Sequence, residues 1–314
     1  MSVEGKGSCC AVSRNSEKTA IEAAPIIPAG VGERSNAIAL PGGRSHVGID
    51  NPAIPKDGEG PARFVKLNPF ALEAQTVTNR RFAEFVDATG YVSEAERFGW
   101  SAVFAGLVPK DTEVMGSAPD TPWWWRIDGA CWRHPEGPGS SIEDRLDHPV
   151  TQVSHADAVA FATWVGGRLP SEAEWERAAH GGVVGRKFVW GDEEPTDTKI
   201  FCNIWQGRFP DHNTMADGYM GTAPALSFEP NEGGFYNMAG NVWEWTADPY
   251  RIRSISRHAK QRNAAAVAAD ERLLKGGSFL CHYSYCYRYR IAARMALTPD
   301  SAASNVGFRV AYDA

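Results

Sequence analysis

Chain-breaking residues and tryptophans are frequent in this sequence, and together they constrain its fold more than any other feature. The 314 residues include 31 glycines, 20 prolines and 11 tryptophans. Glycine and proline interrupt long helices and strands, whereas buried indoles can fix the loops between short elements by packing. The composition therefore predicts an irregular α+β fold with ordered loops and little regular secondary structure, and it argues against helical bundles or βαβ repeats.

Charge and hydropathy exclude several classes of protein. Hydrophobic residues make up 43% and charged residues 22% of the chain, which is typical of a globular protein with a sizeable core. The formal net charge of −6 offers no basic surface for nucleic acid. Because no run of 18 apolar residues and no apolar signal core occur, we expect a cytoplasmic protein without a membrane partner. We also expect a monomer.

The sequence divides into a short tail and one domain. Residues 1–37 are small and polar with mixed charge, which predicts a flexible tail. Cys9 and Cys10 lie in this tail, where a solvated pair is favoured over a metal-trapping one. No linker interrupts residues 38–314, which we interpret as a single domain.

Capping signals predict several short helices. Thr78 precedes an apolar stripe that ends at Gly90, and the pattern indicates a helix between them. Ser154 and Ser171 each stand three residues before an acidic residue, as in a capping box, and glycines follow both stretches. Residues 251–270 are basic and then alanine-rich, which favours a surface excursion that includes a helix.

Two cysteines, Cys281 and Cys286, are separated by four residues near the C-terminus. Taken alone, this spacing favours a structural or incidental pair over a redox or metal site. Nearby cations lower the pKa of a thiol and would hold thiolates. Two soft thiolates suit Cu(I), but they are too few for a structural zinc site. The flanking cations are Lys275, Arg288, Arg290 and Arg294.

The residues around the pair resemble a known family. The segments "KGGSFLCHYSYCYRYRIAARMALTPDSAASNVGFRVA", "GGFYNMAGNVWEWTADPY", "CNIWQGRFPDHNT" and "HPVTQVSHADAVAFATWVGGRLPSEAEWERAAHGG" are similar to those of formylglycine-generating enzymes, the sulfatase-modifying factors. The likeness spans residues 38–313, with both cysteines in register. It implies a C-type-lectin-like fold and makes residues 38–314 the catalytic domain.

The resemblance implies an activity and a set of site residues. Members oxidise a cysteine in a Cys-x-Pro-x-Arg segment of a nascent or unfolded sulfatase to Cα-formylglycine with O2. By this likeness, Cys281 and Cys286 would bind Cu(I), with Ser278 and Trp243 beside them in the active site. A peptide groove would lie over the pair, and three residues would contact the substrate: His282, Arg290 and Asn305.

The same family carries structural Ca²⁺, and two sets of residues match its sites. Asparagine and aspartate side chains and loop carbonyls are the oxygen ligands that this cation prefers. Without a metal, the same residues could form a network of Asx turns. The first set is Asn203, Ile204, Asp217 and Tyr219; the second is Asn237, Gly240, Val242 and Glu244.

The sequence departs from the vertebrate members of the family at two cysteine positions. Ile291 and Val310 replace structural cysteines of vertebrate members, which fits a bacterial-type enzyme. Cys131 and Cys202 are predicted to be buried thiols.

The main alternative to an oxidase is a non-catalytic paralogue of the same fold that binds sulfatases or carbohydrate. Loss of the cysteine pair would mark such a paralogue. An iron-dependent sulfoxide synthase would need a histidine-rich helical domain, for which the sequence has no room.

Overall fold

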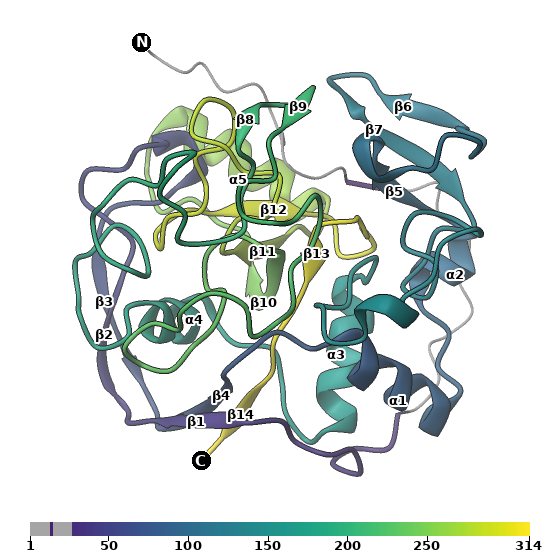
Figure 1. The fold of residues 1–314 in the computed structure, drawn as a ribbon. Coiled ribbons are helices and arrows are strands. Elements are labelled where there is room, and N and C mark those ends of the chain that lie inside the picture. Colours follow the sequence, from purple (N-terminus) through teal and green to yellow (C-terminus); the bar gives the residue numbers. More distant parts are fainter. Residues whose placement is uncertain (1–12, 15–26) are drawn as a thin grey trace.

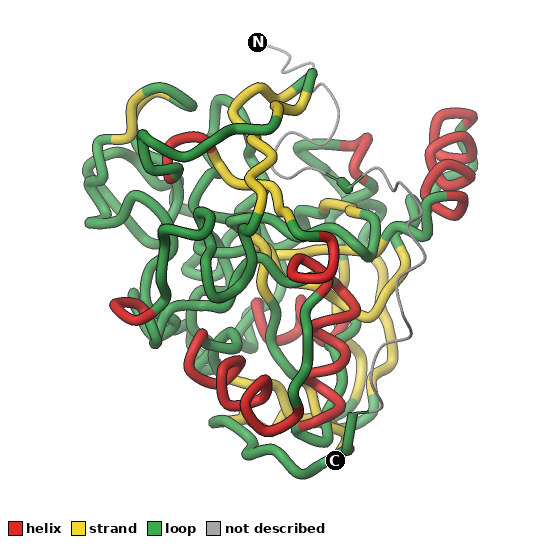
Figure 2. The backbone as a smooth tube through the Cα atoms, turned by 90° about the vertical axis from the view of Figure 1, so that its right-hand side faces the viewer, coloured by secondary structure: helices red, strands yellow, loops and turns green. Residues whose placement is uncertain are grey.

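The structure, a computed structural model, describes residues 13–14 and 27–314. Short helices and strands alternate with long loops that cover much of the surface (Figures 1 and 2). Within the described residues, no helix has the length and apolar character needed to span a membrane. The irregular α+β architecture expected from the glycine, proline and tryptophan content is confirmed.

A four-stranded sheet lies at the centre and leads into the cysteine pair. Its order is β12-β11-β10-β13, antiparallel except for the parallel pair β10 and β13. A second sheet, in the order β1-β4-β14, joins the two ends of the domain. The bounds are β10 (Trp243–Pro249), β11 (Arg272–Lys275), β12 (Met295–Leu297), β13 (Val306–Gly307), β1 (Ala37–Leu40), β4 (Phe70–Glu73) and β14 (Ala311–Asp313).

Smaller sheets form the periphery. The sheet β5-β7-β6 projects at the right of Figure 1, while β2 with β3 and β8 with β9 form two-stranded ribbons. Their bounds are β5 (Trp100–Phe104), β6 (Gly116–Ala118), β7 (Thr121–Asp128), β2 (Gly43–Val47), β3 (Arg63–Leu67), β8 (Gly207–Arg208) and β9 (His212–Asn213).

Within residues 27–314, five α-helices begin at side-chain caps. Ser154 and Ser171 form the predicted capping boxes, and Thr78 accepts a hydrogen bond from the backbone N–H of Arg81. A further capping box at Ser93, which the sequence analysis missed, starts α2. The helices are α1 (Asn79–Thr89), α2 (Glu94–Phe98), α3 (His155–Trp164), α4 (Glu172–Ala179) and α5 (Arg257–Ala268), with 3₁₀ turns at η1 (Pro55–Asp57), η2 (Ala105–Leu107) and η3 (Glu143–Arg145).

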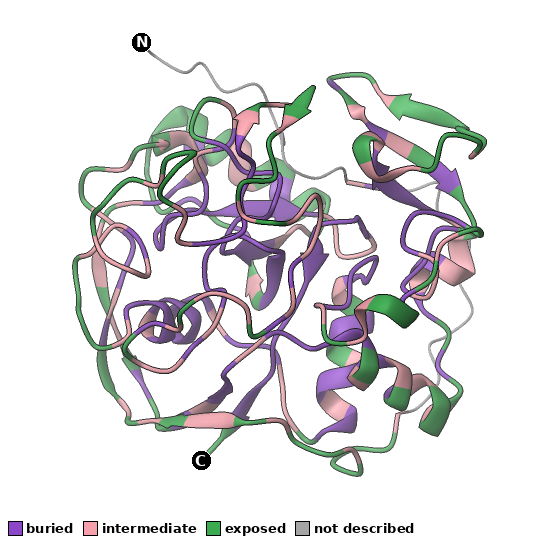
Figure 3. Ribbon diagram, in the orientation of Figure 1, coloured by how far each residue is buried: buried purple, intermediate pink, exposed green. Residues whose placement is uncertain are grey.

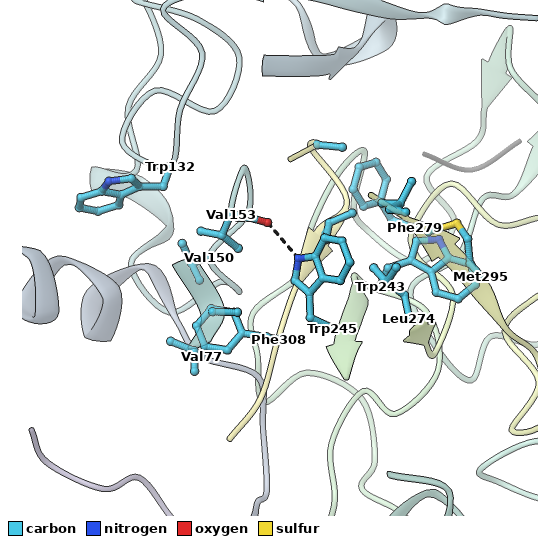
Figure 4. Packing of buried hydrophobic residues seen from close by; sticks show 14 of the residues in the cluster. Val77, Trp132, Val150, Val153, Trp243, Trp245, Leu274, Phe279, Met295 and Phe308 are labelled. Atoms are coloured by element: carbon cyan, nitrogen blue, oxygen red, sulfur yellow. Dashed lines mark hydrogen bonds between the residues drawn. The ribbon is translucent and has the colours of Figure 1, made fainter. Parts of the chain in front are cut away.

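Tryptophans dominate the core. The largest fully buried side chains include six indoles: Trp124, Trp132, Trp175, Trp205, Trp243 and Trp245. The indole N–H of Trp245 donates to the carbonyl of Val153 at 3.1 Å, which fixes a loop to the central sheet (Figure 4). Burial extends well into the irregular segments (Figure 3), so side-chain packing orders the loops in the way the composition predicted.

One fully buried ion pair joins the two main sheets. Arg309, between β13 and β14, donates from Nε and Nη2 to the carboxylate of Glu244 on β10, both at 2.7 Å. Its Nη1 donates to the carbonyl of Glu73 at the end of β4. Such bidentate charge-assisted contacts are among the strongest in a protein interior, so Arg309 fixes how the sheets meet.

The flexibility expected of residues 1–37 stays a prediction, and the structure describes only part of this range. Residues 27–36 are described, and the backbone N–H groups of Gly30 and Val31 donate to carbonyls of Thr163 and Trp164. These bonds satisfy carbonyls at the end of α3 that have no partner within the helix. Gly30 and Val31 therefore complete that helix terminus. Cys9 and Cys10 lie outside the described residues.

Candidate active site

A double-glycine turn directs the chain from β11 into the site. Gly276 and Gly277 both have positive φ, of 96° and 76°. A Cβ atom on Gly277 would lie 2.9 Å from the carbonyl oxygen of Arg288 and 3.1 Å from the nitrogen of Tyr289. Glycine therefore permits two stretches of the segment to pack backbone to backbone, which brings Ser278 next to the cysteines.

The two cysteine sulfurs meet inside the protein. The N–H of Cys281 donates to the carbonyl of Ser278, and the N–H of Cys286 donates to that of His282. These two turns bring the Sγ atoms of the cysteines to 2.9 Å, and both residues are fully buried. The structure thus brings together the pair that the sequence marked as the reactive centre.

A short polar chain contacts the first sulfur. The N–H of Ser278 points to Sγ of Cys281 at 3.4 Å, and the hydroxyl of Ser278 accepts from Nδ2 of Asn305 at 2.9 Å. All three residues are buried. Ser278 and Asn305, which were predicted separately, therefore belong to one hydrogen-bonded unit, in which Asn305 fixes the orientation of the hydroxyl.

Most of the four cations that flank the cysteines in sequence do not contact the sulfurs, contrary to the expectation that they would stabilise thiolates. Only Arg288 reaches a sulfur, with Nη1 at 3.9 Å from Sγ of Cys286, while its Nε pairs with Asp57 at 2.6 Å. The other three meet carboxylates from distant segments, so they mainly hold the fold. These pairs are Lys275 with Glu176, Arg290 with Glu59 and Arg294 with Glu172. A contact of Arg290 with substrate stays a prediction.

A cavity of about 540 Å³ lies beside the pair. Cys202, His282 and Tyr289 contribute to its wall. Burial raises the pKa of Cys202 well above that of an ordinary thiol, and nearby Cys281 adds to the rise. Burial also lowers the pKa of His282, which favours the neutral ring. The sequence analysis identified Cys202 as a buried thiol but gave no signal that it lines the site.

Trp243 and the remaining thiols have core positions. Trp243 is fully buried beside Phe279 and Met295 (Figure 4), and its indole nitrogen has no hydrogen-bond partner. Cys131 and Cys202 are buried free thiols, as predicted. The position of Trp243 suits both packing and a role near the pair.

In the first candidate calcium set, the carboxylate of Asp217 is suited to bind a cation. Burial raises the pKa of Asp217, and no cationic side chain opposes that rise. The carboxylate accepts from Nε2 of Gln206 and from the N–H of Tyr219. A half-buried carboxylate that forms no ion pair with a described cation is the kind of ligand that Ca²⁺ neutralises. Asn203 and Ile204 lie on the neighbouring loop.

The second candidate set fits only in part. Oδ1 of Asn237 is buried without a hydrogen-bond partner, as expected of a metal ligand. The carboxylate of Glu244, however, is held by Arg309 and by the indole N–H of Trp175. Gly240 packs so closely that an added Cβ would lie 2.2 Å from the carbonyl oxygen of Asn203. Glu244 therefore has a structural role, and its side chain does not suit Ca²⁺.

Comparisons with known proteins identify the family. A family model described as "Sulfatase-modifying factor enzyme 1-like domain" matches residues 24–314. A protein named formylglycine-generating enzyme from Thermomonospora curvata is 53% identical over 284 residues, covering 88% of this chain and 93% of the relative. A Bos taurus protein named inactive C-alpha-formylglycine-generating enzyme 2 is 43% identical over 294 residues, covering 91% and 90%.

A solved structure supports the fold. PvdO from Pseudomonas aeruginosa is similar with a TM-score of 0.59 and 22% identity, covering 93% of this chain and all of PvdO. This likeness concerns architecture alone, and it agrees with the C-type-lectin-like fold expected from the sequence. Since the family model spans nearly the whole chain and the relatives match over most of their length, this chain belongs to the sulfatase-modifying factor family of formylglycine-generating enzymes.

Proposed function

We propose that this protein oxidises a cysteine in a Cys-x-Pro-x-Arg segment of sulfatases to Cα-formylglycine. The buried sulfur pair of Cys281 and Cys286 carries the proposal, because two sulfurs in contact beside a cavity can bind a soft metal ion together. The name of the Thermomonospora curvata relative supports the same activity. The conversion removes two protons and two electrons from the substrate CH2–SH group, and water then replaces the sulfur, which leaves as hydrogen sulfide. O2 would accept these two electrons together with two more from a thiol reductant, and would be reduced to water.

The residues of the chain supply binding, orientation and exclusion of water. Both cysteine sulfurs would hold Cu(I), which accepts soft ligands at low coordination number and would make O2 reactive at the site. The N–H of Ser278 and the guanidinium of Arg288 favour negative charge on the sulfurs. Burial of the pair keeps bulk water from the reacting sulfur.

A non-catalytic binding protein of the same fold is the second candidate. The name of the Bos taurus relative calls that protein inactive, so membership of the family alone does not establish catalysis. The cysteine pair of this chain favours catalysis, since binding to a sulfatase or carbohydrate would not need two sulfurs in contact.

Mass spectrometry of a Cys-x-Pro-x-Arg peptide separates the two candidates. The peptide is incubated with the protein, Cu(I), a thiol reductant and O2. Conversion to the aldehyde lowers the peptide mass by about 18 Da, and an otherwise identical peptide with serine in place of cysteine should remain unchanged. If the cysteine peptide binds but keeps its mass under every metal condition, the protein is a binder and not an oxidase.

We also propose a structural Ca²⁺ at Asp217. A ligand that binds only the folded state raises the melting temperature by mass action. EDTA should therefore lower the melting temperature, and Asp217→Asn should remove that response. Elemental analysis without calcium, together with an unchanged melting curve in EDTA, would contradict the site.

A further inference from the structure

A second cavity lies where the end of α4 meets β2, and none of the residues assigned to the active site lines it. Helix α4 packs against β2 (Figure 1), and the cavity beside this contact has a volume of about 320 Å³. A water molecule takes up roughly 30 Å³ of the liquid, so the cavity has room for a small ligand. The residues of its wall indicate which chemistry that ligand would have.

Two histidine rings form part of the wall. His46 on β2 and His180 after α4 meet edge to face, with ring centres 5.8 Å apart. His180 is 5% exposed, and apart from a weak contact with the backbone of Val183 its ring nitrogens have no hydrogen-bond partner among the described residues. Nδ1 of His46 is likewise buried without a partner in residues 13–14 and 27–314. Buried polar groups are nearly always hydrogen-bonded, so these nitrogens point to a partner from outside the chain.

The wall of the cavity is positively charged. Arg44 and Arg177 line it together with the two histidines, and no described aspartate or glutamate does. The guanidinium of Arg177 donates to the carbonyl of Arg44 at 3.2 Å, and the guanidinium of Arg44 lies 4.2 Å from the ring centre of Phe64. Neither contact neutralises the charge of its arginine, so both charges remain to attract an anion.

Two negative groups near the cavity already have partners. The carbonyls of Ala178 and Ala179 at the end of α4 accept from Nδ2 of Asn231 at 2.8 and 3.1 Å, which offsets part of the negative end of the helix. The carboxylate of Glu232 accepts from both terminal nitrogens of Arg186, at 2.6 and 2.8 Å. These groups therefore oppose an anion in the cavity only weakly.

An anion suits this wall better than a metal ion. Two imidazoles are too few to hold a transition metal, and the described residues contain no cluster of three or more His, Cys, Asp or Glu side chains that could hold one. The arginines would repel a cation, whereas guanidinium groups bind oxyanions through paired hydrogen bonds. Burial lowers the pKa of His180 to about 4, and nearby His46 and Lys275 add to this effect, so the neutral ring offers one donor and one acceptor.

We propose that this cavity binds a small tetrahedral oxyanion between Arg44, Arg177, His46 and His180. Inorganic phosphate and sulfate share this chemistry. Only phosphate keeps a proton near neutral pH, which it can donate to the acceptor nitrogen of His180. The site is separate from the proposed oxidation of sulfatases, and a bound anion would fasten the end of α4 to β2.

Phosphorus NMR and thermal melts of the whole chain, at constant ionic strength, test the site with inorganic phosphate. Two or three charge-assisted hydrogen bonds correspond to a Kd on the order of 1 mM. At ten times that concentration, phosphate should raise the melting temperature by about 3 °C, because it binds only the folded state. Phosphate also stabilises proteins non-specifically, so the part of the rise that the variants lose is the measure of the site.

Three variants identify the ligands of the anion. Arg177→Ala should weaken phosphate binding about tenfold, as expected for one charge-assisted hydrogen bond, and His180→Phe should abolish it. Arg257→Ala removes the same charge from an exposed position of α5, is the matched control and should bind phosphate like the wild-type chain. If His180→Phe fails to fold, the half-exposed Arg177→Ala decides the test.

Sulfate forms the second arm. Binding of phosphate without sulfate would support the site and make His180 an acceptor, whereas binding of both would support a site that recognises charge and shape. Equal phosphate Kd values for Arg177→Ala and Arg257→Ala, or the absence of binding by either anion, would overturn the proposal. Stoichiometric Zn²⁺ binding that His180→Phe abolishes would also overturn it, since the histidines would then be metal ligands.

Discussion

The stretch between β11 and β12, residues 276–294 and here called the cysteine segment, contrasts with α5. The cysteine segment contains no helix or strand, yet most of its residues are buried. Helix α5 is regular over twelve residues, yet it buries only Ala259 and Ala266. Ion pairs and sulfur contacts hold the cysteine segment in place. Helix α5 is held by an N-cap at Ser256 and by hydrogen bonds between the side chain of Asn263 and the backbone of Ile252.

The comparison shows that regular backbone geometry and tight fixation by tertiary contacts are separate properties of a segment. A helix satisfies its own backbone and can stand on a surface with few tertiary contacts. An irregular buried segment must instead find a partner for each polar group elsewhere in the chain. The cysteine segment does so through Asp57, Glu59 and α4. Its geometry is therefore set by distant residues, as a site that needs exact placement of two sulfurs requires.

The largest expected effect is on activity. Cys281→Ser and Cys286→Ser should each abolish conversion of the peptide and tight Cu(I) binding, because two sulfurs are needed to hold the metal. Each buried hydroxyl should cost only about 1–3 kcal/mol of unfolding free energy. Ser278→Ala should keep the metal and slow turnover. Mass spectrometry and thermal melts measure these outcomes. Near-full activity of either serine variant would refute the shared role, and unfolding of both would make the pair structural.

The buried support of the cysteine segment should give the largest effect on stability. Lys275→Met leaves the fully buried carboxylate of Glu176 without its cation, which should cost about 3–5 kcal/mol. Denaturant unfolding measures this. The exposed Lys260→Met on α5 is the matched control and should change stability by less than about 0.5 kcal/mol.

A double-mutant cycle sharpens this test. Glu176→Gln added to Lys275→Met removes the unpaired charge while an amide oxygen still accepts from the N–H of Gly48. The double variant should therefore recover part of the lost stability. If Lys275→Met and Lys260→Met cost the same, the contrast between the two regions would be wrong.

Acid should loosen the end of α4 that supports the cysteine segment. Burial lowers the pKa of His180 to about 4, and the proximity of His46 and Lys275 adds to this effect. Since the folded pKa lies below the unfolded value of 6.5, the stability contribution is complete above pH 6.5 and is lost as the pH falls toward 4. The loss reaches about 3 kcal/mol.

Unfolding free energies measured between pH 7 and pH 4 test this dependence. His180→Phe should flatten the curve, whereas His258→Phe at an exposed position of α5 should leave it as it is. Equal curves for the wild-type chain and His180→Phe would show that His180 does not carry the acid response.

The smallest effect concerns α5 itself. Ser256→Ala removes the hydroxyl that accepts from the N–H of Ala259, at a cost of about 1 kcal/mol. Ser256→Asp keeps an acceptor and should retain stability. The rate of peptide oxidation should be the same in the wild-type chain, Ser256→Ala and Ser256→Asp. A loss of activity in Ser256→Ala would indicate that α5 is coupled to the site.

Local signals in the sequence were sufficient to predict the capped helices, but not the ion pairs that hold the site in place. The caps at Thr78, Ser154 and Ser171 were predictable because a cap is decided within four residues. The pairing of Arg288 with Asp57 joins positions 231 residues apart, and no local pattern marks such partners. The flanking cations were therefore interpreted as neighbours of the sulfurs, whereas most of them hold the fold.

The family resemblance supplied the remaining site residues, within limits set by the fold. It named Ser278 and Asn305, which the structure joins by a hydrogen bond, but matching positions could not reveal that the carboxylate of Glu244 is held by Arg309. The hydrogen bonds of Arg14 with Trp100 and Ser301 also join distant positions, and no local pattern in the sequence marks them.

The pairing of β14 with β4 has a consequence for synthesis of the protein. Tyr312 donates to Glu73 across 239 residues, so the sheet β1-β4-β14 lacks one strand until residues 311–313 have left the ribosome. A domain closed by such distant contacts folds slowly and only after its chain is complete. Translation that stops before position 306 would thus release a protein that contains both cysteines but lacks β13 and β14, and with them one strand of each main sheet.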